Sequence, residues 1–282
     1  MHSWHWHTWQ GLSYLTCDLL SQFPHGFFTQ HFSPRTPTEL TAVLEPQAEC
    51  YRVHQVHGNT VLTPAEIQQA LEGDRPCEAM DSSPFPPADG VVTEQGGHAA
   101  WVCTADCVPA LVADVRTGQV AAIHAGWRGT ATEIVPRAIA RLQQQGSRLE
   151  DLRVALGPAI AGERYQVSTE VAAQVGATVL APTPALAKTA TAPPRSYLPH
   201  DATNAIIESL WHLADSPLLP DPEPGKVRLD VRRVNLLQLK RLGLAAEQVA
   251  IAPYCTYQTA EHFFSYRRNP QKKVQWSGIV SQ

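Results

Sequence analysis

The clearest hydrophobic pattern in the chain is a set of three short apolar runs, each bounded by Gly, Pro or polar residues. They cover residues 99–103, 109–115 and 119–125. Their length and their content of Val, Ala and Ile predict buried β-strands rather than helices. Cys107 and His124 then fall at strand ends, where a sheet can hold a reactive side chain rigidly beside a cleft.

The same pattern predicts further elements on both sides of this stretch. Strands are expected in the aromatic opening segment and at residues 12–20, 25–30, 50–58, 151–156 and 249–252. Helices are expected at residues 130–145, 169–176, within 200–214 and within 227–242. Surface loops are expected at residues 64–87 and 177–194, and a polar tail after Arg268. Because there is no repeat and no linker, the pattern predicts one mixed α/β domain over residues 1–282.

Two of these elements carry specific expectations about single residues. In residues 50–58 the alternation places Tyr51, Val53, Gln55 and His57 on one face of a strand. His57 precedes the turn signal Gly58-Asn59 and should therefore sit at a strand end. In the helix of residues 130–145, Thr130 or Thr132 is the expected cap.

Composition and charge exclude several classes of protein. A hydrophobic content of 44% is enough to fill a core, and the net charge of −4 argues against a nucleic acid or an anionic membrane as partner. The six Cys are scattered without a CxxC pair. The first residues contain neither a basic nor an apolar signal region, and no apolar run reaches membrane-spanning length. A reduced, cytoplasmic protein is expected, and the pattern leaves its oligomeric state open.

His57, Cys107 and His124 are the residues best suited to chemistry. Two His and one Cys suit zinc, and three protein ligands leave a fourth position for water or substrate. The competing interpretation is a nucleophile pair in which His124 raises the thiolate fraction of Cys107. Their spacings of 50 and 17 residues have no local signature, so the residues alone leave both open.

Two other groups of residues could bind ligands. Glycine-flanked amides at an expected helix start, beside the guanidinium of Arg128, are suited to an anion, and Arg267 and Arg268 could add a second cationic contact. His5 and His7 would share one face of a strand and could bind metal adventitiously. Aromatic residues are common in strands, which explains this opening segment better than a site does.

Seven motifs in register resemble the YfiH family, also called the laccase-domain family. They are HQVHGNTV (54–61), ADGVVT (88–93), TADCVPALVAD (104–114), IHAGWRGT (123–130), LGPAI (156–160), LDVRRVNLLQL (229–239) and CTY to FFSYRR (255–268). The resemblance implies a single α/β domain with a mixed layered sheet flanked by helices. Its Cys and His placement is similar to the catalytic domain of cytotoxic necrotizing factor toxins. It also implies zinc bound by His57, Cys107 and His124.

The activity implied by the resemblance is phosphorolysis of adenosine, inosine and methylthioadenosine, with adenosine deamination as a second reaction. The implied partners are a purine nucleoside and phosphate. Cys107, His124 and Asp106 are then the expected catalytic residues, and Arg128 and Arg267 the expected substrate contacts. Asp106 could be a general acid or base, or the partner of a ligating His, or only the cap of a turn.

Other functions given to this family remain as alternatives. One is amide or editing chemistry on peptidoglycan precursors, with Cys107 as nucleophile and His124 as base; another is a binding factor for such precursors. Polyphenol oxidation ranks lower, because a multicopper site needs several His-x-His clusters. Gln30, Ala159, Glu163 and Arg164 depart from the pattern of many relatives, as does a shortened segment before residue 54. These departures bear on substrate preference.

Overall fold

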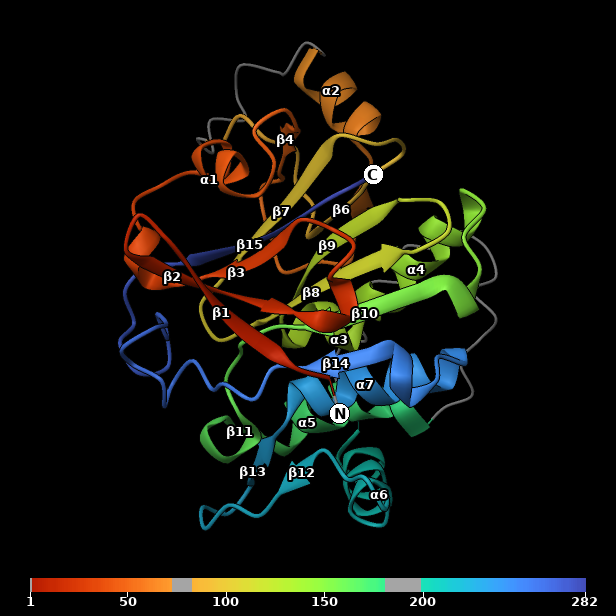
Figure 1. Cartoon of the computed structure of the whole chain (residues 1–282). Coiled ribbons are helices and arrows are strands. Elements are labelled where there is room, and N and C mark those ends of the chain that lie inside the picture. The colour runs from red at the N-terminus through yellow and green to blue at the C-terminus, as the bar shows by residue number, and fades with distance from the viewer. Residues whose placement is uncertain (1, 73–82, 181–198) are drawn as a thin grey trace.

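The chain folds into two packed β-sheets, with helices covering the outer face of one of them. A computed structural model describes residues 2–72, 83–180 and 199–282, and Figure 1 shows the course of the chain. Two sheets have six strands each, and a small third sheet has three. Each six-stranded sheet contains both parallel and antiparallel pairs, and helices are interspersed among the strands, which confirms the predicted α/β class with mixed sheets flanked by helices.

The first sheet combines both ends of the described chain with strands from its middle. Its order is β1 (Trp4–Trp9), β2 (Leu12–Cys17), β3 (His25–Phe28), β15 (Gln275–Val280), β7 (His98–Thr104) and β4 (Glu49–Tyr51). The aromatic opening segment is a strand, as predicted, and it pairs with β2 as a β-hairpin. The strand predicted to reach residue 20 ends earlier, and the short 3-10 helix η1 (Asp18–Leu20) follows it.

β15 shows that the prediction of a polar tail after Arg268 is wrong. This strand lies between β3 and β7 and is antiparallel to both, and in Figure 1 it runs along the middle of the sheet. The sequence pattern did not indicate β15, because Gly278 lies within it and glycine usually weakens a strand. A Cβ on Gly278 would lie 2.5 Å from atoms of the Trp101 indole, so the neighbouring strand fills the volume that a side chain would occupy.

Replacing Gly278 by alanine is expected to lower the free energy of unfolding by about 1–3 kcal/mol, the usual cost of overpacking a core. Chemical denaturation would measure the loss. Gly90→Ala is the control, since its Cβ would meet the methyl groups of Val61 at 3.2 and 3.3 Å and the Ala122 carbonyl oxygen at 3.5 Å, and should cost less. Equal unfolding midpoints for Gly278→Ala and the unsubstituted protein would contradict this account of β15.

The second sheet contains two of the three apolar runs. Its order is β14 (Val249–Ile251), β10 (Leu152–Leu156), β8 (Val108–Asp114), β9 (Val120–Ala125), β6 (Gly90–Val92) and β5 (Val61–Leu62). All residues of β8 and β9 are buried, as predicted for strands covered on both faces. The third run is β7 of the first sheet, and its strand assignment is also confirmed.

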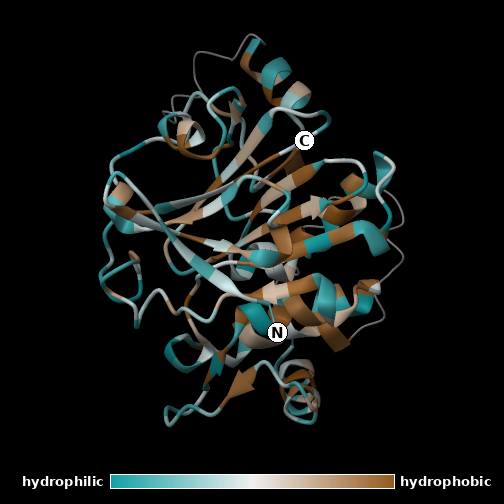
Figure 2. Cartoon of the chain, in the orientation of Figure 1, coloured by the Kyte–Doolittle hydropathy of each residue, from teal (hydrophilic) through white to brown (hydrophobic). Residues whose placement is uncertain are grey.

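Apolar side chains fill the space between the layers. Leu15, Phe27, Leu111 and Ile279 belong to the cluster between the two sheets. A second cluster joins the outer face of the second sheet to α4 (Ile134–Gln144), α5 (Thr169–Leu180) and α7 (Val231–Leu242). Figure 2 shows hydrophobic residues concentrated on the central strands and the helices beside them. The strands next to Cys107 and His124 therefore belong to a buried framework that can hold these side chains in place.

The remaining elements lie around this framework. They are α1 (Pro37–Leu44), α2 (Pro64–Glu72), α6 (His200–Trp211), the small sheet β11 (Gln166–Ser168), β13 (Lys226–Leu229) and β12 (Leu218–Leu219), and the 3-10 helices η2 (Gln30–Phe32), η3 (Leu149–Asp151), η4 (Gly162–Arg164) and η5 (Ala246–Gln248). The two predicted surface loops each begin with helix, in α2 and in the last turn of α5. Their residues 73–82 and 181–194 lie outside the described residues. None of the described helices combines the length and apolarity needed to cross a bilayer.

The helix predicted at residues 130–145 is instead two helices. α3 (Trp127–Ala131) ends before Thr132, and α4 begins after Glu133, which has a left-handed backbone with φ of 57°. Thr132 does not cap α4, because its hydroxyl donates back to the carbonyls of Arg128 and Gly129. The capping prediction for Thr130 and Thr132 is therefore wrong, although the apolar face of α4 is buried as expected.

Candidate metal centre

The side chains of His57, Cys107 and His124 meet at one point. Their ligand atoms all lie within 4.8 Å of one another, and the two imidazole rings are nearly perpendicular with centroids 4.8 Å apart. They come from the segment after β4, the turn before β8 and the end of β9. The structure thus brings together three residues that are up to 67 positions apart in the chain.

The β8–β9 hairpin places Cys107 beside His124. Val108 pairs with Ala125 and Pro109 with His124, so Cys107 lies across from Gly126. A Cβ on Gly126 would lie 3.0 Å from Cys107 Sγ and 3.5 Å from His124 Nε2. Only glycine leaves this space open next to the three side chains.

His57 reaches the site by a route that the sequence pattern did not predict. β4 ends at Tyr51, and His57 has a left-handed backbone with φ of 60° rather than a strand conformation. The Gln55 side chain replaces strand pairing, since it accepts from the Cys103 amide at 2.7 Å and donates to the Cys103 carbonyl at 2.8 Å. The predicted strand over residues 50–58 is wrong beyond Tyr51, but His57 still arrives at the site with an exposed side chain.

Asp89 is the residue of this site that the sequence analysis missed. Its carboxylate is fully buried and accepts hydrogen bonds from His124 Nδ1 at 2.8 Å and from the His57 amide at 2.9 Å. The motif ADGVVT was identified, but nothing local pointed to its Asp. An Asp followed by Gly between apolar residues usually signals a turn.

The charges of the site favour a thiolate. Burial raises the pKa of the Cys107 thiol, but the positive charge of His124 and hydrogen bonds from both histidines outweigh it, and the pKa falls below its usual range. Burial lowers the pKa of His124, but the Cys107 thiolate and the Asp89 carboxylate outweigh it and raise the pKa. Without metal, these opposite directions favour a Cys107 thiolate that accepts a hydrogen bond from the His124 imidazolium, so that the two side chains share one proton.

The donor set fits a metal ion that prefers nitrogen and sulfur. Tetrahedral zinc with bonds of about 2.0–2.3 Å needs ligand atoms about 3.3–3.6 Å apart, so small side-chain movements within the 4.8 Å limit suffice. A bound cation would replace the proton that Cys107 and His124 share. The space beside Gly126 and the exposed edge at His57 leave room for the ion and for a further ligand.

Aromatic and cationic side chains surround the opening next to Cys107. The cavity there, about 30 Å³ in volume, is lined by Asp106, Cys107, Ala125, Gly126, Trp127, Ile160, Tyr165 and Val231. The exposed guanidinium of Arg128 stacks over Trp127 at 4.5 Å, and that of Arg267 over Tyr165 at 4.9 Å. Both predicted substrate contacts therefore lie on the aromatic rim of the cavity.

Tyr165 links these groups electrostatically. Burial and the Cys107 thiolate raise its pKa to about 12, while Arg267 and Arg128 act to lower it. The expected anion site at a helix start depends on these guanidinium groups, because α3 has only five residues.

Asp106 does not partner a ligating histidine. Its Oδ1 accepts from the Thr256 hydroxyl at 2.6 Å and its Oδ2 from the Arg267 amide at 2.7 Å. The expected role beside His124 belongs to Asp89, and Asp106 instead anchors the segment that carries Arg267. Arg268 is also internal to this segment, donating to the carbonyls of Thr256, Tyr257 and Phe263, so it is not the second cationic contact.

Known proteins with similar sequences identify the family. A family model described as multi-copper polyphenol oxidoreductase laccase matches residues 36–280. The chain belongs to this laccase-like family. The resemblance to YfiH proteins is thereby confirmed.

Two relatives named purine nucleoside phosphorylase and one named adenosine deaminase align with most of this chain. It is 50% identical over 282 residues to a purine nucleoside phosphorylase of Synechocystis sp., covering 99% of this chain and 97% of the relative. It is 33% identical over 217 residues to a purine nucleoside phosphorylase of Streptomyces coelicolor, covering 77% and 69%. It is 28% identical over 214 residues to the adenosine deaminase RL5 of an unknown prokaryote, covering 76% and 68%.

Solved structures share the fold of this laccase-like chain. YlmD from Geobacillus stearothermophilus superposes with a TM-score of 0.72 at 24% identity, covering 98% of each chain. YfiH from Bacillus licheniformis does so with a TM-score of 0.69 at 22% identity, covering 97% of this chain and 98% of that one.

The family's description mentions a multicopper site, which needs several clusters of metal ligands. The described residues of this chain bring together fewer ligands than such a site needs. Within residues 2–72, 83–180 and 199–282, only His57, Cys107 and His124 form a group of three metal-binding side chains. His5 pairs with Asp18 at 2.7 Å, and His7 bonds to Thr16 at 2.8 Å. Both imidazoles therefore have partners elsewhere in the opening segment, which agrees with the structural interpretation that the sequence favoured.

Proposed function

We propose that the protein is a zinc-dependent purine nucleoside phosphorylase. It takes adenosine, inosine or methylthioadenosine together with phosphate, and it also deaminates adenosine. The observation that carries this proposal is the position of the His57–Cys107–His124 cluster beside the rim formed by Arg128 and Arg267. The names of the relatives support the same reaction classes.

His57, Cys107 and His124 would hold the zinc ion. The His124 ligand atom is Nε2, because Nδ1 is bonded to Asp89. Zinc bound there would supply a Lewis acid for polarising substrate oxygen or activating water. Three protein ligands are typical of catalytic rather than structural zinc.

The rim residues would bind and orient the two substrates. Guanidinium groups are suited to phosphate because they present several donors in one plane, and Arg128 and Arg267 are both exposed. Trp127 and Tyr165 offer aromatic faces for the purine. A cavity of about 30 Å³ is far smaller than a typical ligand pocket of about 300 Å³ or more. The nucleoside is therefore expected to lie across the mouth of the cavity, with the reacting atoms directed toward Cys107 and His124.

Asp106 has a supporting role in this proposal. Both of its carboxylate oxygens are bonded, one to the Thr256 hydroxyl and one to the Arg267 amide. Of the roles suggested by the sequence, positioning of Arg267 agrees best with these contacts, and general acid or base catalysis agrees less well.

An assay with adenosine tests the proposal. Adenine that forms only when phosphate is present indicates phosphorolysis, and inosine that forms with or without phosphate indicates deamination. Metal analysis of the purified protein is expected to give about one zinc per chain. Absence of turnover with adenosine, inosine and methylthioadenosine would rule the proposal out.

A second function is favoured by a separate observation. Cys107, His124 and Asp89 are arranged as nucleophile, base and orienting acid, with the charged pair that a Cys–His nucleophile needs. We infer amide chemistry on peptidoglycan precursors as this alternative. A metal-free protein that iodoacetamide inactivates through Cys107, and that turns over no nucleoside, would favour it over the phosphorylase.

A further inference from the structure

Asp89 contacts two of the three candidate ligands through one buried carboxylate. Oδ1 accepts from His124 Nδ1 and from the His57 amide, at 2.8 and 2.9 Å. Oδ2 accepts from the amides of Gly58 and Val56, at 2.6 and 3.2 Å. Every contact is with an N–H donor, so the site needs a group that only accepts hydrogen bonds.

For His124, Asp89 determines which ring nitrogen faces the site. The side chain accepts from Nδ1, and the backbone carbonyl of Asp89 accepts from the His124 amide at 2.7 Å. Nε2 is left to face Cys107, with which it shares a hydrogen bond, and the space beside Gly126. A proton held on Nδ1 keeps a lone pair on Nε2, as a metal ligand requires.

For His57, Asp89 stabilises a turn that the sequence alone would not favour. A left-handed backbone is uncommon for a residue other than glycine, and His57 has φ of 60°. The amides of residues 56, 57 and 58 all converge on the carboxylate of Asp89. Such converging amides form a cradle for an anion, and here the anion is a side chain of the same protein.

We propose that Asp89 is a positioning residue that preassembles the metal centre. It joins the His57 turn and the His124 strand into one unit before the ion binds. This inference rests on the proposed function, because it requires that His57, Cys107 and His124 bind zinc. Asp106 cannot substitute, since its oxygens bond to Thr256 and Arg267.

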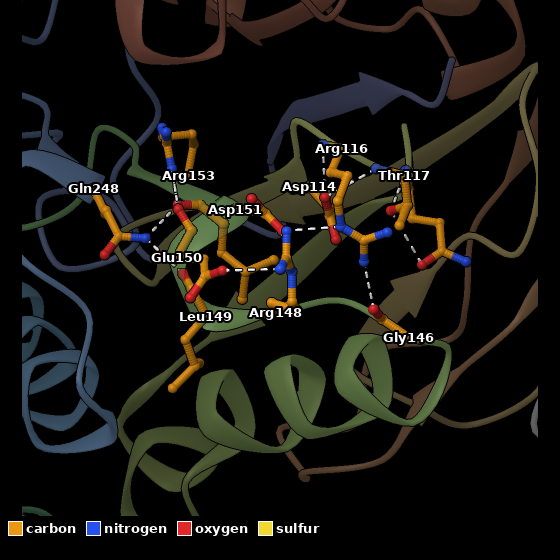
Figure 3. Close-up of polar contacts among 12 residues, drawn as sticks. Asp114, Arg116, Thr117, Gly146, Arg148, Leu149, Glu150, Asp151, Arg153 and Gln248 are labelled. Atoms are coloured by element: carbon orange, nitrogen blue, oxygen red, sulfur yellow. Dashed lines mark hydrogen bonds and ion pairs between the residues drawn. The ribbon is translucent and has the colours of Figure 1, made fainter.

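The test compares three variants of the full chain, Asp89→Ala, Asp89→Asn and Asp114→Asn. Asp114 is the matched control, because it is equally buried and accepts from the amides of Arg116 and Thr117 at 2.8 and 3.0 Å. It lies at the opposite end of β8 from Cys107, and Figure 3 shows its contacts at that turn. It therefore reports what the loss of a buried carboxylate does to the fold alone.

The readouts are zinc affinity, by competition with a chelator, and the absorption spectrum of bound Co²⁺, which responds to thiolate and imidazole ligation. Asp89→Ala is expected to bind zinc about 10–100-fold more weakly than the unsubstituted protein, with a changed cobalt spectrum. The zinc affinity of Asp89→Asn should lie between those of Asp89→Ala and the unsubstituted protein, since its side-chain amide keeps one accepting oxygen. Asp114→Asn should keep the zinc affinity and the cobalt spectrum, whatever its effect on stability.

The outcomes separate this proposal from the one it rests on. If the unsubstituted protein binds neither zinc nor Co²⁺, both the zinc-dependent function and the role of Asp89 are overturned. If it binds them and the Asp89 variants bind equally well, only the role of Asp89 is overturned. The role of Asp89 is also overturned if Asp114→Asn loses as much zinc affinity as the Asp89 variants do. Should Asp89→Ala fail to fold, the comparison of Asp89→Asn with Asp114→Asn decides.

Discussion

Replacing Cys107 by alanine is expected to lower the rate of adenosine phosphorolysis by roughly 1,000-fold, or about 4 kcal/mol of transition-state stabilisation. Cys107 supplies the only sulfur among the three candidate ligands, and it lies between His57 and His124. Its loss leaves two neutral imidazoles, which hold zinc weakly. Adenine release in the presence of phosphate and zinc content per chain are the two measurements, and both should fall together.

Cys103→Ala is the matched control for this experiment. Cys103 lies four residues earlier, in β7, is also partly exposed, and is not among the three ligands. Burial raises its pKa to about 12, whereas the pKa of Cys107 is lowered. Activity and zinc content should be unchanged in Cys103→Ala. If Cys107→Ala retained full zinc content and full activity, the metal centre described above would be refuted.

Removing both rim guanidinium groups, in the double variant Arg128→Ala with Arg267→Ala, is expected to raise KM for phosphate by roughly 100-fold or more. Each charge-assisted contact to an anion contributes about 1.5–3 kcal/mol, and 1.4 kcal/mol is about tenfold. Deamination of adenosine uses no phosphate, so its rate should change little. Initial rates at varied phosphate, with inosine formation measured in parallel, distinguish the two effects.

Arg164→Ala serves as the control for that pair. Its exposed guanidinium stacks over Tyr257 at 5.7 Å, and Tyr257, unlike Trp127 and Tyr165, does not line the cavity beside Cys107. Its substitution should leave KM for phosphate unchanged. An unchanged KM in the double variant, or an equal loss of deamination, would show that Arg128 and Arg267 do not bind phosphate.

The geometry also explains why one site supports two chemical proposals. Asp89, His124 and Cys107 form a chain of acid, imidazole and thiolate, which serves a metal ion and a nucleophile equally well. The difference lies in His57, which a Cys–His–Asp arrangement does not need and a three-ligand metal site does. Retention of activity in His57→Ala would therefore favour the nucleophile.

Local sequence determined the strands that carry the site. Short runs of Val, Ala and Ile are stable only when their side chains are buried. The strands that this pattern predicts at residues 109–115 and 119–125 are therefore confirmed. Ligand chemistry was also readable, because Cys107 and His124 end those runs and few side chains bind zinc. His57 lies with Cys107 and His124 in the candidate metal centre, even though its predicted strand is absent after Tyr51.

Tertiary structure alone decided what holds those ligands in place. Asp89 lies 32 residues from His57 and 35 from His124 along the chain, and no local pattern reports a hydrogen bond across such separations. The same holds for β15, whose Gly278 makes room for Trp101, and for Asp106, which turned out to hold Arg267. Periodicity records whether a side chain is buried, but the partner it meets there is set by how distant segments pack.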